Sequence, residues 1–348
     1  MLTVIFGAGA SYDSIPSLPP NMADTEMVKQ LRPPLANDLF GDRGPFNHAI
    51  AHFQRLQPII PWLRHTGGRN VESVLRSLLD ESDVYPERHR QIMAVRYYLQ
   101  YVLWECEVGW KNQSSGVTNY KSLLDEIARF RKDQVVSLVT FNYDTLLEDA
   151  LPAVRPPIAS MGDYVHGDSP YKVFKLHGSV NWARTVGQYA YKDRNAWFVA
   201  RDHIERAASL AISDTFVMAT EHPCGMDHNP HGTLGLVPAI AIPVEQKSCF
   251  ECPAEHLHRL EQLLPTTERL LIIGWRATEE HFLNLLGKHL TRPIPAYIIA
   301  GSSDEALNVA SRLRSGLPNL DYLPAPGGFT DAIVNHRVRE LLDRPIQF

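Results

Sequence analysis

The stretch from Val135 to Asp144, VVSLVTFNYD, most constrains what this chain can fold into. Its first half is a short apolar run rich in β-branched residues, which is typical of a buried parallel strand. The run stops at four polar side chains: Thr140, Asn142, Tyr143 and Asp144. Ligands of open α/β sheets bind at the carboxyl ends of the strands, so this cluster predicts a binding site. Capping of a following helix by Asn142 and Asp144 is an equally good interpretation of this stretch alone.

Further apolar runs alternate with helical patterns along the chain. Strands are predicted at 2–6, 135–139, 171–176, 270–274, 296–300 and 320–323. Helices are predicted at 254–264, 279–290, 304–313 and 330–342. Strand-then-helix repetition predicts an α/β fold, a doubly wound Rossmann-like parallel sheet with a helical insertion.

Residues 1–348 are predicted to form one domain, and the rest of the chain is interpreted as insertions in it. Apolar residues at helical spacing predict a helical insertion over 46–133, and the mixed composition of 183–232 predicts a second, smaller insertion. Residues 15–45 are rich in proline and are expected to form an irregular cover. The apolar run 234–243 contains Pro238 and Pro243, which should limit its strand pairing.

The composition excludes several classes of protein. The formal net charge is −5, so there is no basic signal for nucleic acid. No run reaches the roughly 18 apolar residues of a membrane helix, and the first residues, MLTVIF, lack the basic flank of a signal peptide. Four cysteines among 348 residues do not form a disulfide scaffold, which favours a cytoplasmic location.

A glycine-rich turn follows the first predicted strand. Gly7, Ala8, Gly9, Ala10 and Ser11 stand where backbone amides can approach a phosphate closely. A full dinucleotide fingerprint has a third glycine where this chain has Tyr12, so the turn alone is weak evidence. Ser11 is expected to cap a helix or to contact phosphate. We expect Gly9→Val to weaken nucleotide binding and to leave the fold largely intact.

Two more strand ends complete an ordered set of motifs. Lys175-Leu-His177-Gly-Ser179 ends the third strand, and Leu271-Ile-Ile-Gly274 ends the fourth. Together with the glycine turn and Asn142-Tyr-Asp144, this order resembles the sirtuin (silent information regulator) superfamily. The resemblance implies that Asn142, His177 and Asp144 are catalytic. It also implies that NAD+ is bound by Gly7, Ala8, Gly9, Ala10, Ser11, Thr140, Gly274, Trp275 and Arg276.

The chain departs from sirtuin deacylases in ways that bear on activity. Ser17-Leu18-Pro19 replaces their Asp-Phe-Arg, and Trp275 with Arg276 replaces a pair of small residues. Pro33-Pro-Leu35…Leu39-Phe40 and the TFNYD form look like the bacterial sirtuin-like branch associated with antiphage defence. That branch hydrolyses NAD+, so the resemblance implies an NAD+ glycohydrolase. The alternatives are a protein deacylase or ADP-ribosyltransferase, and a non-catalytic nucleotide-binding subunit.

Cysteine and histidine clusters raise the question of a metal. Cys249, Cys252, His256 and His258 lie within ten residues of one another, but their spacing is not that of a zinc finger. His222, Cys224, His228 and His231 form a second loose group. We predict no metal site. Since no second sensor region is visible, we expect activity to be controlled by homo-oligomer formation or by a separate activating protein from the same operon.

Overall fold

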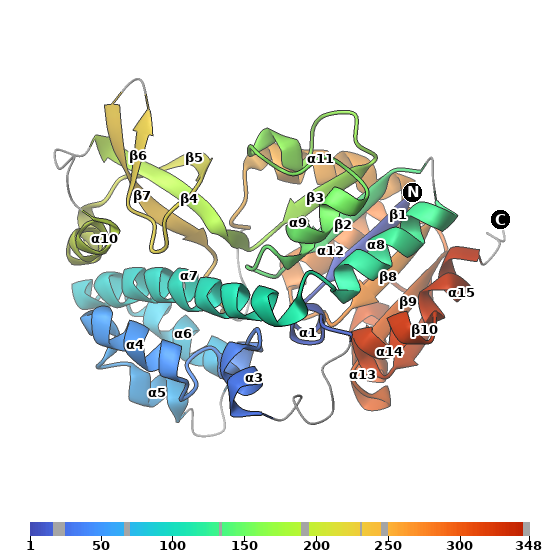
Figure 1. The fold of residues 1–348 in the computed structure, drawn as a ribbon, viewed down its shortest axis with the longest axis horizontal. Coiled ribbons are helices and arrows are strands. Elements are labelled where there is room, and N and C mark those ends of the chain that lie inside the picture. The colour runs from blue at the N-terminus through green and yellow to red at the C-terminus, as the bar shows by residue number, and fades with distance from the viewer. Residues whose placement is uncertain are drawn as a thin grey trace.

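A computed structural model describes residues 1–16, 25–65, 70–131, 134–188, 195–229, 232–244 and 250–343. Two β-sheets lie toward opposite ends of the long axis, and the long helix α7 (Pro86–Ser114) runs beside the smaller one and ends near the larger one (Figure 1). The catalytic candidates all belong to the larger sheet or to the loops that leave it.

The larger sheet contains six parallel strands. They are β1 (Leu2–Phe6), β2 (Val136–Thr140), β3 (Tyr171–Lys175), β8 (Arg269–Ile273), β9 (Ile294–Ala300) and β10 (Leu320–Pro326). Their order is β10-β9-β8-β1-β2-β3, so β1 pairs with β2 on one side and with β8 on the other. The strand order therefore reverses direction at β1. This is the order of a doubly wound Rossmann-like sheet, which confirms the predicted fold class.

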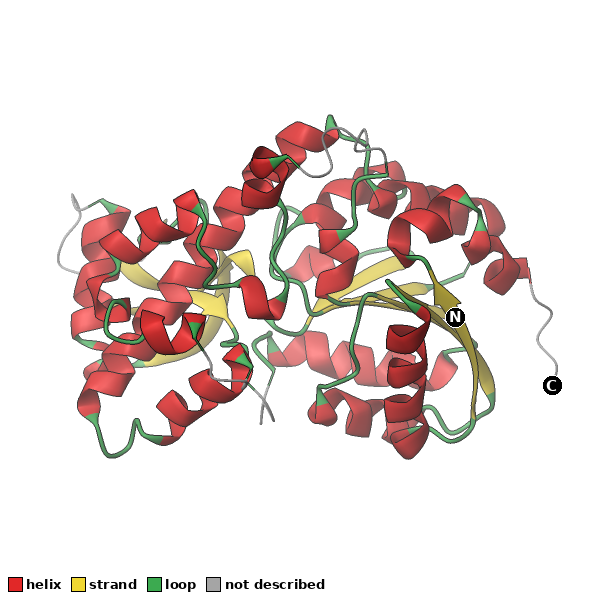
Figure 2. Ribbon diagram, turned by 90° about the horizontal axis from the view of Figure 1, so that it is seen from below, coloured by secondary structure: helices red, strands yellow, loops and turns green. Residues whose placement is uncertain are grey.

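The parallel strands are apolar because both faces of the sheet are covered. Every residue of β1, β2, β3 and β8 is buried, and helices lie on both sides of the sheet in Figure 2. A strand with two covered faces needs a continuous apolar run instead of alternation. That requirement explains why these strands were visible in the sequence.

The smaller sheet is antiparallel and has the order β5-β4-β7-β6. Its strands are β4 (Gly178–Gln188), β5 (Ile212–Met218), β6 (Met226–Asn229) and β7 (Gly232–Ile240). The pairing of β7 with β6 ends at Gly235, while Pro238 lies opposite Ala183 of β4. A proline has no N–H to donate, so Pro238 is tolerated where β6 no longer runs beside β7.

Helices make up most of the remaining described chain. They are α1 (Ala8–Tyr12), α3 (Glu26–Leu31), α4 (Gly44–His52), α5 (Ile60–Arg64), α6 (Val71–Asp80), α7, α8 (Asn119–Phe130), α9 (Leu146–Ala150), α10 (Ala196–Glu205), α11 (Ala254–Leu263), α12 (Glu280–His289), α13 (Ser303–Gly316), α14 (Gly328–Val334) and α15 (Arg337–Asp343). None of these described helices is both long and apolar enough to cross a membrane.

Two hydrophobic cores follow the two sheets. Helices α4 to α6 and much of α7 pack with the antiparallel sheet in one core. Tyr120, Leu123 and Ile127 of α8 pack instead in the core of the parallel sheet, although α8 falls within the predicted helical insertion. The end of α7 joins the same core through Trp110.

Two expectations about local structure were wrong. The closing helix predicted over 330–342 is divided into α14 and α15, because His336 adopts a left-handed φ of 54° that no helix can continue through. The segment 15–45 is not wholly irregular, because Thr25 accepts a hydrogen bond from Val28 N and caps α3. Residues 17–24 of the expected cover lie outside the described residues.

Candidate active site

Three glycines join the two halves of the parallel sheet where the strand order reverses. Gly9 N donates to Gly274 O at 3.1 Å, and Gly7 N donates to Ile273 O at 3.0 Å. A Cβ on Gly7 would lie 2.5 Å from Gly274 O, and a Cβ on Gly9 would lie 2.8 Å from Gly274 Cα. Gly274 itself has a φ of +61°. These positions accept only glycine because backbone packs directly on backbone.

Asn142 belongs to a buried polar cluster with Ser11 and Tyr120. Its Nδ2 donates to Ser11 Oγ at 2.9 Å and to Tyr120 Oη at 3.1 Å, while the two hydroxyls lie 2.9 Å apart. The backbone N of Asn142 donates to Thr140 Oγ1 at 3.0 Å. Ser11 therefore neither caps α1 nor is free of partners in this structure. It fixes the orientation of the Asn142 amide.

Asp144 stands beside a set of charged side chains. Burial raises the pKa of the Asp144 carboxyl to about 6, against the opposing effect of the Lys175 charge and with a further increase from Glu107. Asp144 Oδ1 also accepts from Leu146 N at 3.2 Å, so Asp144 caps α9 as the alternative interpretation proposed.

Lys175 contacts the backbone of Asp144 and the carboxylate of Glu148. Its side chain is fully buried, its Nζ donates to the carbonyl of Asp144, and it forms an ion pair with Glu148 at 3.0 Å. Glu107 of α7 accepts from both the backbone N and the hydroxyl of Thr145, at 2.8 and 2.6 Å. Paired buried charges of this kind are strongly held, because breaking one pair leaves the other charge uncompensated.

His177 follows β3 and packs against the two neighbours of Asn142. Its ring lies edge-on to Phe141 with the centroids 4.8 Å apart, and 6.1 Å from the ring of Tyr143. The next residue, Gly178, has a φ of +79°, and a Cβ there would lie 1.8 Å from Ala239 O. Gly178 is thus required for the chain to turn into β4. This turn places the His177 ring at the carboxyl end of β3.

Trp275 and Arg276 behave differently from each other. The Trp275 ring stacks on Phe141 at 5.3 Å and 8°, and its Nε1 donates to Glu279 at 2.6 Å. The side chain of Arg276 is exposed, and its carbonyl accepts from Arg312. Trp275 therefore lies over the carboxyl ends of the strands, between the glycine turn and Phe141.

The predicted site residues converge but are covered. Ser11, Asn142, His177 and Trp275 are only 2, 6, 6 and 3% exposed, whereas Ala8 lies at the surface and Ala10 is on the buried side of α1. Sequence reasoning missed Tyr120, Glu107, Glu148 and the role of Lys175. A lysine inside an apolar strand was a visible signal for the last of these. Tyr120 offered none, since it is one of 13 tyrosines and precedes Asn142 by a whole helix.

The predicted cysteine and histidine clusters can be followed only in part. Within the described residues, no three His, Cys, Asp or Glu side chains are grouped so as to hold a metal ion. Cys249 and His231 lie outside those residues. His256 is buried and bonds Met161 O at 3.0 Å, while burial raises the pKa of the Cys224 thiol.

Part of this chain matches a known protein family. Residues 136–224 match the family model of the SIR2-like domain. That span begins at β2 and contains Asn142, Asp144 and His177. No curated protein matches the chain.

Several solved structures are similar in outline. One is a Sir2 homolog–NAD complex, at 16% identity over 98% of this chain and 90% of that chain, with a TM-score of 0.43. Another, described as the structural basis for the mechanism and regulation of Sir2 enzymes, has 12% identity over 97% and 93% and a TM-score of 0.38.

The fold and the family match define the class of protein. Residues 136–224 are similar to the SIR2-like domain, so the sirtuin-like resemblance predicted from the sequence is confirmed.

Proposed function

We propose that this protein is an NAD+ glycohydrolase that cleaves NAD+ to ADP-ribose and nicotinamide. One observation carries the proposal. The glycine contact, the Asn142 cluster and His177 all stand at the carboxyl ends of β1, β2 and β3, next to the point where the strand order reverses. Doubly wound sheets bind nucleotides at this point of the sheet.

The reaction requires little covalent chemistry from the protein. Nicotinamide leaves NAD+ as a neutral ring, so the bond to ribose is already activated. The protein must hold the ribose, favour a cationic transition state and admit water to one face. Backbone amides of the glycine turn are suited to the diphosphate and take no part in the chemistry.

Asn142 and Asp144 are proposed to orient the ribose. An amide can donate and accept hydrogen bonds at once, and Ser11 with Tyr120 holds this amide in one orientation. Asp144 lies within the same charged corner as Lys175 and would support developing positive charge on the sugar.

His177 is proposed as the general base for a ribose hydroxyl or for water. Imidazole titrates near neutral pH, which suits proton transfer in both directions. Phe141 and Tyr143 fix the plane of its ring from two sides.

We also propose that the protein is the NAD-depleting effector of a bacterial antiphage defence system that acts in the cytoplasm. Unrestrained loss of NAD+ would kill the host cell, so the resting enzyme must be idle. The covered state of Asn142, His177 and Trp275 supports such an idle form. Assembly into a homo-oligomer, or binding of an activating protein from the same operon, would open the site.

The test is release of nicotinamide from NAD+ by an activated preparation. Asn142→Ala and His177→Ala should each lower turnover by about 100-fold or more, since each removes a positioning or proton-transfer group. Thermal stability should shift by only a few degrees. Asn308→Ala and His65→Ala, at exposed positions, serve as matched controls. If the His177→Ala variant consumes NAD+ as fast as the wild type, the hydrolytic centre lies elsewhere.

A further inference from the structure

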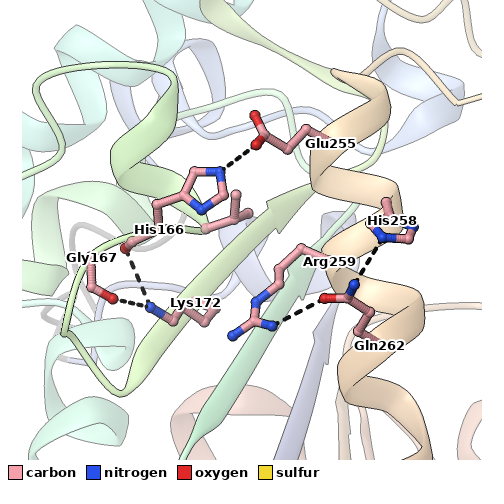
Figure 3. Close-up of a pocket in the computed structure, with 8 residues that line it drawn as sticks. His166, Gly167, Lys172, Glu255, His258, Arg259 and Gln262 are labelled. Carbon is pink, nitrogen blue, oxygen red and sulfur yellow. Dashed lines mark hydrogen bonds and ion pairs between the residues drawn. The ribbon is translucent and has the colours of Figure 1, made fainter.

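A pocket lies away from the catalytic candidates, beside the edge strand β3. It is formed by the start of β3, the loop 165–167 and the outer face of α11, and its volume is about 330 Å³ (Figure 3). Lys172 and His177 belong to the same short segment, but they stand at opposite ends of β3. Five residues of extended chain separate them by about 16 Å.

Basic side chains dominate the lining of this pocket. Lys172 enters from β3, while His258 and Arg259 enter from α11. Lys172 is only 5% exposed, yet its Nζ contacts only backbone carbonyls, those of Gly167 at 2.7 Å and His166 at 3.3 Å. Two carbonyls leave one of the three ammonium protons for another acceptor.

The acidic groups nearby do not balance these charges. Glu255 is engaged by His166 at 2.8 Å on the rim. Arg259 Nη1 donates to the neutral amide of Gln262, and within the described residues neither Lys172 nor Arg259 forms an ion pair. Burial lowers the pKa of Lys172, and the charges of Arg259 and Arg155 lower it further, against a smaller effect of Asp168. Positive charge is thus concentrated here, and among the described residues no carboxylate forms an ion pair with Lys172 or Arg259.

The chemistry of the lining selects the kind of ligand. A guanidinium fork beside an ammonium suits the several acceptor oxygens of a phosphate, and imidazole and amide groups at the same wall can add donors. The volume is about ten times the space one water occupies in the liquid, so more than a bare phosphate fits. The lining contains no large aromatic ring on which a base would stack.

We propose that this pocket binds a small phosphate-bearing metabolite, with its phosphate held between Lys172 and Arg259. The site is separate from the NAD+ crevice and does not depend on the proposed hydrolysis. Recognition rests on the phosphate group, which a sugar phosphate, a mononucleotide or free phosphate would share.

Calorimetry on the full chain tests the site with inorganic phosphate, ribose 5-phosphate and AMP. Saturable binding of at least one probe is expected for the wild type. Lys172→Met keeps the buried stem and removes the charge, and Arg259→Gln does the same at the second position. Each should weaken binding tenfold or more, whereas Lys288→Met on the exposed end of α12 should not. Circular dichroism confirms that the variants are folded.

The probes and further variants separate the outcomes. Equal affinity for all three probes supports recognition of phosphate alone, and tighter binding of a larger probe supports contact with the rest of the metabolite. Unchanged binding in Asn142→Ala and His177→Ala places the ligand outside the NAD+ crevice. The proposal is overturned if no probe binds, if both charge-removing variants bind like the wild type, or if Asn142→Ala abolishes binding.

Discussion

The absence of a side chain on Gly9 is needed for the packing of two backbone segments. Its missing side chain admits the backbone of Gly274, so a Cβ would push the end of β8 away from the start of α1. The expectation that Gly9→Val would leave the fold largely intact is therefore wrong. Gly9→Ala should lower the free energy of unfolding by about 1–3 kcal/mol, as overpacking does. Denaturant unfolding measures this, and Gly187→Ala, with no atom within 4 Å of its new Cβ, is the control. Equal stability of the two variants would contradict the close contact.

Asp144 gives a pH dependence with a defined sign. Its pKa rises from 3.8 to about 6 on folding, so the folded state retains a proton that the unfolded chain releases between these values. The contribution of this carboxyl to stability is present below 3.8 and is lost as the pH rises to about 6. Asp144→Asn carries no such penalty and keeps the oxygen that caps α9.

The variant and the wild type should therefore diverge as the pH rises. Relative to the wild type, Asp144→Asn should gain up to about 3 kcal/mol between about pH 4 and about pH 8. Urea unfolding at both values measures the gain. A difference that is constant with pH would show that Asp144 ionises normally in the fold.

At the residue scale, the candidate residues that the sequence indicates are those at the ends of strands. Asn142, His177 and Gly178 stand at strand ends, and the end of a strand can be read from where an apolar run stops. The partners of Asn142 could not be read in this way. Tyr120 and Ser11 reach it from two other elements, and such contacts depend on how α8 packs and not on any local pattern.

Among the elements, α7 shows the greatest range of partners. Tyr97 lies buried on its first half, where its hydroxyl donates to Leu236 O of β7 at 2.8 Å and lies 2.7 Å from His203 Nδ1. Burial lowers the pKa of His203 to about 4, so this imidazole is neutral at physiological pH. The helix is thus joined to the antiparallel sheet and to α10 by one phenol.

Removal of the Tyr97 hydroxyl tests how much these hydrogen bonds stabilise the fold. Tyr97→Phe should cost about 1–3 kcal/mol, because it removes the buried hydrogen bonds of the phenol to Leu236 O and to His203 Nδ1. The melting temperature under fixed conditions measures the loss. Tyr85→Phe is the matched control, since Tyr85 is exposed just before the same helix. If both variants melt together, the Tyr97 hydroxyl does not contribute to holding α7 on the sheet.

The helices that sequence reasoning placed least well are those set by tertiary contacts. The pattern over 330–342 is helical throughout, but the chain turns at His336, which lies 2.9 Å from Glu126 of α8. A contact with α8 cannot be anticipated from the segment itself. By contrast, α13 was placed well because Ser302 and Glu305 form a capping box that is written in the sequence.

For the molecule as a whole, the sheet class was predictable and the second sheet was not. Continuous apolar runs reveal parallel strands buried on both faces, whereas β5 is only partly buried and β6 has four residues. Short, half-exposed antiparallel strands carry a weak signal. The region 183–232 was accordingly described only as mixed.

Metal independence is a prediction about the whole fold. Cys249→Ser combined with Cys252→Ser should leave the melting temperature and NAD+ cleavage nearly unchanged, and a chelator should do the same for the wild type. A structural zinc supplies folding free energy, so its removal would unfold the chain. Stoichiometric zinc in a metal assay together with unfolding by the chelator would contradict the prediction.

The length of α7 also has a mechanical meaning. Its 29 residues span about 43 Å, with α4 and α10 near one end and Glu107 and Lys111 near the other. A rod of this kind acts as a lever: a tilt of about 5° at its first turn would displace Lys111 by about 3 Å. Lys111 forms an ion pair with Asp149. Glu107 accepts a hydrogen bond from Thr145, the residue after Asp144. A force applied to α4 or α10 would thus displace the residues beside Asp144, whose carboxylate is proposed to hold the ribose.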